Sequence, residues 1–102
     1  MKKKNYKLAK PFFQNLLKDK EIRILFEEEK AKTEIAHAVR AARLKANLTQ
    51  TELAKKIDTT QSVIARLESG SDKRVPSLGL LARIAAACGA TFEFGFNFRK
   101  VS

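Results

Sequence analysis

Between residues 48 and 70 the sequence predicts two short helices joined by a turn of only three residues. Thr49 and Glu52 have the spacing of a capping box, in which a hydroxyl and a carboxylate each accept a hydrogen bond from the other residue's backbone N–H. The first helix is therefore expected to begin there. The polar run 58–60 forms the turn, and Gly70 follows the second helix as a left-handed cap. Helices connected in this way cross near a right angle, so the second one projects as a separate rod.

The apolar residues of these two helices recur at helical spacing and predict a shared core. The expected inward positions are Leu53, Ala54, Ile57, Val63, Ile64 and Leu67. The side chains left outward at the start of the second helix are Gln61, Ser62, Ala65 and Arg66. A helix fits the major groove of DNA, where Gln can make a bidentate contact with adenine and Arg with guanine.

Two further helices are expected to flank this pair. One is Ala-rich and runs from Glu34 to Ala46, with Asn47 after it in a position that favours a left-handed backbone. The other follows Ser77 and continues to Cys88, where Gly89 stops it. The segment 33–89 is thus predicted as one helical domain, between an N-terminal extension at residues 1–32 and a C-terminal segment at residues 90–102.

The charge of the chain indicates an anionic partner. It has 21 Lys and Arg against 11 Asp and Glu, a net charge of +10 on 102 residues, which favours nucleic acid over a protein that is merely basic. A single cysteine, Cys88, excludes an internal disulfide and reads as a small buried apolar residue. No apolar run reaches the length of a membrane span, and the basic start lacks the apolar stretch of a signal peptide, so a cytoplasmic protein is expected.

The blocks LTQTELA, TTQS and LESG, followed by PSL, resemble the XRE family of helix-turn-helix proteins, which includes the lambdoid phage repressors. The likeness extends over about Ile35 to Gly89. It implies a lambda-repressor-like bundle of about five helices that binds palindromic operators in double-stranded DNA as a homodimer, with no catalytic activity, cofactor or metal. Asn47 and Asp58 stand where most members have glycine, and both residue types tolerate a left-handed backbone.

The resemblance also assigns roles by matching position. Base-facing residues would be Gln61, Ser62, Ala65 and Arg66. Phosphate contacts would come from Gln50, Thr60, Lys73 and Arg74. A structural salt bridge would join Arg43 and Glu68.

The N-terminal extension is predicted to be helical and amphipathic, with Pro11 in a first turn and Asp19 as the N-cap of a second helix. With the following domain and a terminal strand, this plan resembles the HigA-type antitoxins, which repress their own operon and neutralise a small RelE-like ribonuclease toxin. The likeness makes a set of apolar residues candidates for the toxin-facing surface: Phe12, Phe13, Leu16, Leu17, Ile22, Leu25 and Phe26. The same residues would equally serve to pack the extension onto the domain.

Phenylalanines alternate with other residues near the C-terminus, which is the period of a β-strand with one aromatic face. They are Phe92, Phe94, Phe96 and Phe98. A lone strand leaves its backbone groups without partners, so this one is expected to pair with a second copy, an N-terminal segment or another protein. It is the candidate dimer strand.

The sequence therefore predicts a mainly α protein with an N-terminal amphipathic helical extension and a C-terminal β-strand. Its expected function is that of a DNA-binding repressor and antitoxin. Two alternatives stay open: a stand-alone phage-type repressor without a toxin, and a protein-binding adaptor that no longer binds DNA. His37 lies in a helix without partners at metal spacing, so neither a metal site nor a catalytic base is expected there.

Overall fold

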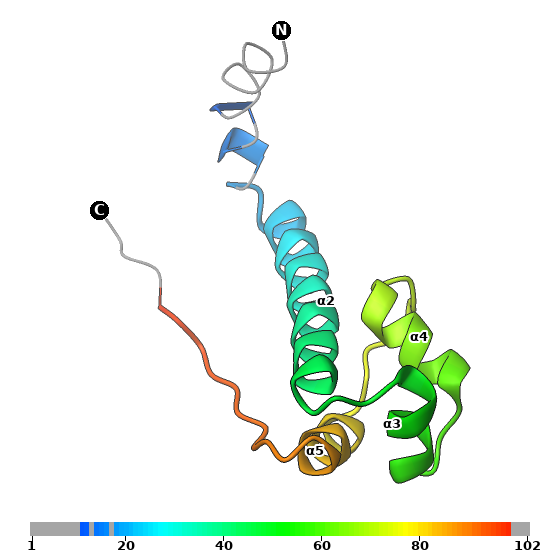
Figure 1. Ribbon diagram of the computed structural model, residues 1–102. Helices are drawn as coiled ribbons and strands as arrows, with labels where there is room; N and C mark the ends of the chain where they lie inside the picture. Colours follow the sequence, from blue (N-terminus) through cyan, green and yellow to red (C-terminus); the bar gives the residue numbers. More distant parts are fainter. Residues whose placement is uncertain (1–10, 13, 17, 99–102) are drawn as a thin grey trace, which may run out of the picture. The chain divides into compact units, whose positions relative to one another are not determined.

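The computed structural model describes residues 11–12, 14–16 and 18–98, and the structural statements below concern these residues. The chain is mainly helical, as predicted, with α2 at Lys20–Lys45, α3 at Gln50–Lys56, α4 at Gln61–Ser69 and α5 at Leu78–Ala87 (Figure 1). Residues 11, 12 and 14–16 are also helical. The chain divides into two units, residues 1–34 and 35–102.

Helix α2 is longer than the sequence analysis predicted, because it joins two segments that were expected to be separate helices. Asp19 caps its start, since its Oδ1 accepts from the backbone N–H groups of Glu21 and Ile22 at 2.9 and 3.2 Å. The predicted break near Thr33 is wrong. The Thr33 hydroxyl donates to the carbonyl of Glu29 at 3.1 Å instead of capping a new helix, and no Gly or Pro interrupts residues 20–45.

The two short helices begin where the sequence predicted. The capping box is present: the Thr49 hydroxyl accepts from the Glu52 N–H at 3.0 Å, and the Glu52 carboxylate accepts from the Thr49 N–H at 2.8 Å. Asn47 and Asp58 have the left-handed backbone expected of them, with φ of 59° and 55°. Gly70 ends α4 at φ 71°, also as predicted.

The core of residues 35–102 is formed where α3, α4, α5 and the last turns of α2 meet. Leu53 and Ile64 are fully buried. The other buried apolar residues are Ala36, Val39, Ala54, Ile57, Leu67, Leu81, Ile84 and Ala85. Five of the six predicted inward positions on α3 and α4 are thus buried, and the sixth, Val63, is half-buried. Because α3 has 7 residues and α4 has 9, neither is long enough to be stable alone, and this shared core holds them in place.

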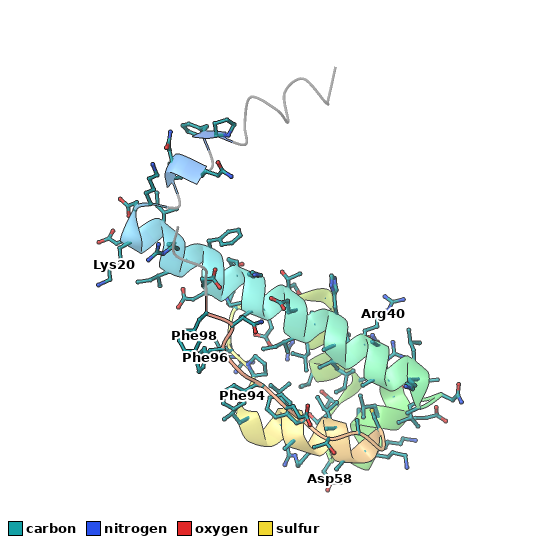
Figure 2. All side chains as sticks on the ribbon, turned by 90° about the vertical axis from the view of Figure 1, so that its left-hand side faces the viewer. Lys20, Arg40, Asp58, Phe94, Phe96 and Phe98 are labelled. Carbon is teal, nitrogen blue, oxygen red and sulfur yellow. The ribbon has the colours of Figure 1, made fainter. Side chains whose placement is uncertain are left out.

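The predicted C-terminal strand is absent from the described residues, where residues 90–98 form neither helix nor strand. Phe92 packs against the core, and its ring stacks on that of Phe94 with centroids 6.3 Å apart. Phe94, Phe96 and Phe98 are 72%, 84% and 93% exposed (Figure 2). A strand needs a neighbour for its backbone groups, and no described segment of the single chain supplies one.

No helix in the described ranges is long and apolar enough to cross a membrane.

Replacing the capping threonine tests the local origin of α3. We expect Thr49→Ala to lower the free energy of unfolding by about 1 kcal/mol, because the Glu52 N–H loses its partner. Urea unfolding followed by circular dichroism measures this. Thr51→Ala is the matched control, since Thr51 is an exposed residue inside the same helix. Equal stability of Thr49→Ala and the wild type would contradict the capping role.

Candidate nucleic-acid interface

Helix α4 presents a polar edge to solvent while its other side is fixed in the core. Ile64 and Leu67 anchor it and are buried. Gln61, Ser62 and Arg66 are exposed, and Ala65, which was expected to face outward with them, is half-buried. The Thr60 hydroxyl caps the start of α4 by accepting from the Val63 N–H at 3.4 Å. Among the described residues the polar edge is therefore exposed to solvent.

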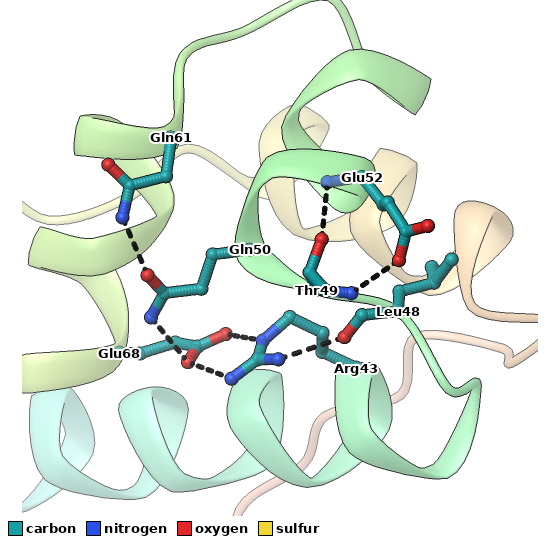
Figure 3. Close-up of polar contacts among 7 residues, drawn as sticks. All are labelled: Arg43, Leu48, Thr49, Gln50, Glu52, Gln61 and Glu68. Carbon is teal, nitrogen blue, oxygen red and sulfur yellow. Dashed lines mark hydrogen bonds and ion pairs between the residues drawn. The ribbon is translucent and has the colours of Figure 1, made fainter.

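A chain of side-chain hydrogen bonds connects this edge to the domain interior (Figure 3). The Gln61 side-chain amide donates to the Gln50 Oε1 at 2.7 Å, and the Gln50 Nε2 donates to the Glu68 Oε1 at 3.1 Å. Sequence analysis assigned Gln50 and Gln61 to DNA separately and missed their contact with each other. Each of these two glutamines is the first residue of its helix, so their contact brings the starts of α3 and α4 side by side. This shared position was the signal that the sequence offered.

Arg43 and Glu68 form the ion pair that the family resemblance implied. Arg43 Nε and Nη2 donate to the two carboxylate oxygens of Glu68 at 2.6 and 2.9 Å, and Arg43 Nη1 donates to the Leu48 carbonyl at 2.9 Å. The side chains are only 11% and 4% exposed. This two-pronged geometry joins α2, α4 and the loop before α3.

The surroundings of the pair favour its charged form. Burial alone raises the pKa of the Glu68 carboxyl, but the hydrogen bonds from Arg43 and Gln50 outweigh burial, so that this pKa lies below its ordinary value. The hydrogen bond to Glu68 likewise raises the pKa of Arg43. Both groups are therefore ionised at neutral pH.

The loop between α4 and α5 supplies further positive charge. Lys73 and Arg74 are exposed there, as a phosphate-contacting role requires. Asp72 lies beside them, and its Oδ1 accepts from the Arg74 N–H at 3.0 Å. The sequence analysis gave Asp72 no role.

A model of the Helix-turn-helix family matches residues 39–94, which is more than half of the chain. This protein belongs to the helix-turn-helix family. The match is of the XRE type, so the protein is a DNA-binding regulator of transcription. No solved structure matches the chain.

Outside the matched region, this helix-turn-helix protein exposes apolar side chains in its N-terminal unit. Phe12 and Leu25 are 66% and 60% exposed, and Ile22 and Phe26 are each 37% exposed. Leu16 is half-buried, and Phe13 and Leu17 lie outside the described residues. Ile24, which the sequence analysis left out, is 50% exposed.

The described part of this helix-turn-helix protein brings together no three His, Cys, Asp or Glu side chains that could hold a metal ion. His37 is exposed on α2. Cys88 is half-buried, and desolvation raises the pKa of its thiol, which favours the protonated, weakly nucleophilic form.

The ion pair predicts a specific dependence of stability on pH. Folding lowers the pKa of Glu68. The contribution of its charge to the free energy of unfolding is therefore complete above the unfolded pKa of about 4.3, and it is lost as pH falls through the lower pKa of the folded state. Glu68→Gln should lower the free energy of unfolding by about 3 kcal/mol at pH 7, because Arg43 keeps its charge without a counter-ion.

Urea unfolding at pH 7, 5 and 3 measures the difference between the variant and the wild type. This difference should shrink between pH 5 and pH 3. Glu93→Gln is the control, since Glu93 is exposed in the C-terminal segment. A difference that stays constant down to pH 3 would contradict the assigned role of the Glu68 charge.

Proposed function

We propose that this protein is a sequence-specific transcriptional repressor that binds a palindromic operator as a homodimer, with α4 in the major groove. The observation that carries the proposal is the exposed polar edge of a helix whose opposite side is buried. Packing of the opposite side keeps the backbone of this edge in one orientation relative to the domain. Such preorganisation lowers the entropy that binding must overcome.

The side chains of the edge divide by chemistry. Arg66 can make two hydrogen bonds to the guanine edge, and Gln61 can do the same with adenine. The hydrogen bond that Gln61 donates to Gln50 restricts the Gln61 amide before DNA binds. Ser62 and the half-buried Ala65 are short, so they let the helix lie close to the bases.

Phosphate contacts supply affinity in this proposal. Lys73 and Arg74 are exposed cations, and Gln50 and Thr60 offer polar groups at the starts of α3 and α4. Each phosphate that a cation neutralises releases condensed counterions, so binding weakens steeply with salt. The net charge of +10 agrees with such binding.

A homodimer would place two copies of α4 in successive major grooves, about 34 Å apart. We propose the C-terminal segment as a contact between the copies, because Phe94, Phe96 and Phe98 expose aromatic rings that water solvates poorly.

Two substitutions separate reading of bases from binding of phosphates. We expect Arg66→Ala to weaken binding by about tenfold to a hundredfold on a duplex selected by the wild-type protein from a random pool, and far less on a scrambled duplex. Lys73→Ala should weaken both duplexes alike and reduce the slope of log K against log salt by about one. Fluorescence anisotropy between 50 and 200 mM salt (roughly the range in which phosphate binding is lost) measures both effects.

Arg83→Ala is the matched control, because Arg83 is an exposed arginine on α5. Equal weakening of both duplexes by Arg66→Ala would contradict its base-reading role, and a flat salt dependence would contradict the DNA-binding model itself. The selected duplex should be a palindrome with half-sites about 10 base pairs apart. Selection of a single half-site would contradict the homodimer.

A second function, that of an antitoxin, is favoured by the exposed apolar residues of the N-terminal unit. Phe12, Ile24 and Leu25 expose half or more of their surface, although burial is the usual state of such residues. Glu27 and Glu28 follow them and are exposed carboxylates, which suit a basic partner. We propose that these residues bind a small basic RelE-like toxin and neutralise it, with the first part of α2 laid in a groove as a helix.

Co-expression with the product of a neighbouring reading frame tests the antitoxin role. We expect a small basic partner to co-purify with the wild type and Leu25→Asp to lose it, because a buried charge lacks a counter-ion in such a groove. Glu21→Asp is a control at an exposed position of the same helix. Retention by Leu25→Asp would contradict this surface. Co-purification without preference for the selected duplex would favour the adaptor function instead.

A further inference from the structure

The loop after α4 contains a carboxylate among cations at the edge of the proposed DNA surface. Asp72 directly precedes Lys73 and Arg74. Its side chain is 26% exposed, whereas that of Arg74 is 81% exposed. Asp72 is thus held against the protein while Arg74 extends from it.

Asp72 contacts Arg74 in two ways. Its Oδ1 accepts from the Arg74 backbone N–H at 3.0 Å, which closes a local turn, and lies 3.6 Å from the Arg74 Nε. The first contact needs only an oxygen acceptor. The second depends on the negative charge, so an amide would keep the turn and lose the ionic attraction.

A second arginine lies near this carboxylate. Asp72, Arg66 and Arg74 line one hollow of about 240 Å³ next to α4. The Arg74 N–H hydrogen bond is the main reason that the pKa of Asp72 is lowered, and the charges of Arg74 and Arg66 add to it. The carboxylate is therefore ionised at neutral pH. It attracts both the proposed base-reading arginine and a proposed phosphate-binding arginine.

This arrangement affects specific and non-specific DNA complexes unequally. Non-specific binding rests almost entirely on phosphate contacts, for which both arginines are available. Asp72 competes with phosphate for both of them and repels the phosphates themselves. In a specific complex Arg66 turns to a base, and Asp72 then competes with phosphate only for Arg74. The carboxylate consequently weakens non-specific binding more than specific binding.

We propose that Asp72 determines specificity by restraining Arg66 and Arg74 from indiscriminate contact with phosphates. A repulsive element that acts mainly against the wrong partner raises discrimination even when it lowers total affinity. This inference rests on the proposed DNA-binding function of α4 and assigns a further residue to it.

Asp72→Asn tests the inference because it keeps the turn and removes the charge. On the scrambled duplex we expect about threefold to fivefold tighter binding than the wild type, the size of an exposed ion-pair effect. The selected duplex should gain less, so the ratio of the two affinities falls. The salt slope on scrambled DNA should steepen by about one phosphate contact. Fluorescence anisotropy with both duplexes provides these values.

Asp58→Asn is the matched control. Asp58 also lies beside cations, Lys56 and Arg83, but in a different hollow (Figure 2 labels it). Asparagine tolerates its left-handed backbone, so the control removes the same charge without strain. Asp72→Ala removes the turn as well as the charge, so Asp72→Asn is the variant that isolates the charge.

The outcomes separate this inference from the function on which it rests. The role of Asp72 is overturned if Asp72→Asn leaves the affinity ratio unchanged, or if Asp58→Asn changes it equally. In either case, a preference of the wild-type protein for the selected duplex still upholds DNA recognition. Wild-type protein without any such preference overturns both.

Discussion

The bidentate ion pair between Arg43 and Glu68 is the interaction on which the arrangement of the helix-turn-helix elements depends. Both side chains are almost completely buried, and the polar contacts of the pair join α2, α4, the Leu48 carbonyl before α3 and Gln50 at the start of α3. Apolar packing alone permits a helix to slide or rotate, because dispersion forces are weakly directional. Hydrogen bonds of fixed geometry allow one arrangement, so the pair defines where α4 lies.

A series of hydrogen bonds leads from this pair to the surface. Glu68 accepts from Gln50, and Gln50 accepts from Gln61, the first exposed residue of α4. Glu68 Oε1 accepts from both Arg43 and Gln50, and no described buried side-chain polar atom lacks a partner. Gln61, the residue proposed to face DNA, is consequently the last member of a series that starts in the core. A flexible amide at this position would lose conformational entropy on binding, whereas this one is already restricted.

Local chemistry was predictable from the sequence, and contacts between distant segments were less so. The capping box at Thr49 and the left-handed backbone at Asn47 and Asp58 follow from residue types at fixed offsets. The bond between Gln50 and Gln61 depends on how two helices meet, which no local pattern contains. The break expected at Thr33 was wrong because a threonine hydroxyl can either cap a helix or bond back to the preceding turn, as it does here. The strand expected at Phe92 to Phe98 requires a partner that the described chain does not include.

The positions of the charges, and not only the net charge, affect how the protein recognises DNA. A body with an excess of ten positive charges is attracted to any duplex, and that attraction carries no information about sequence. Discrimination between sequences therefore requires that part of this electrostatic attraction acts only when the correct bases are present. Glu68 keeps Arg43 from contacting DNA, because the contacts of this ion pair are buried. Asp72 contacts the exposed Arg74 at a longer distance of 3.6 Å, and we propose that a DNA phosphate replaces the Asp72 carboxylate there. The depth at which each carboxylate is buried separates a structural arginine from one that remains available to DNA.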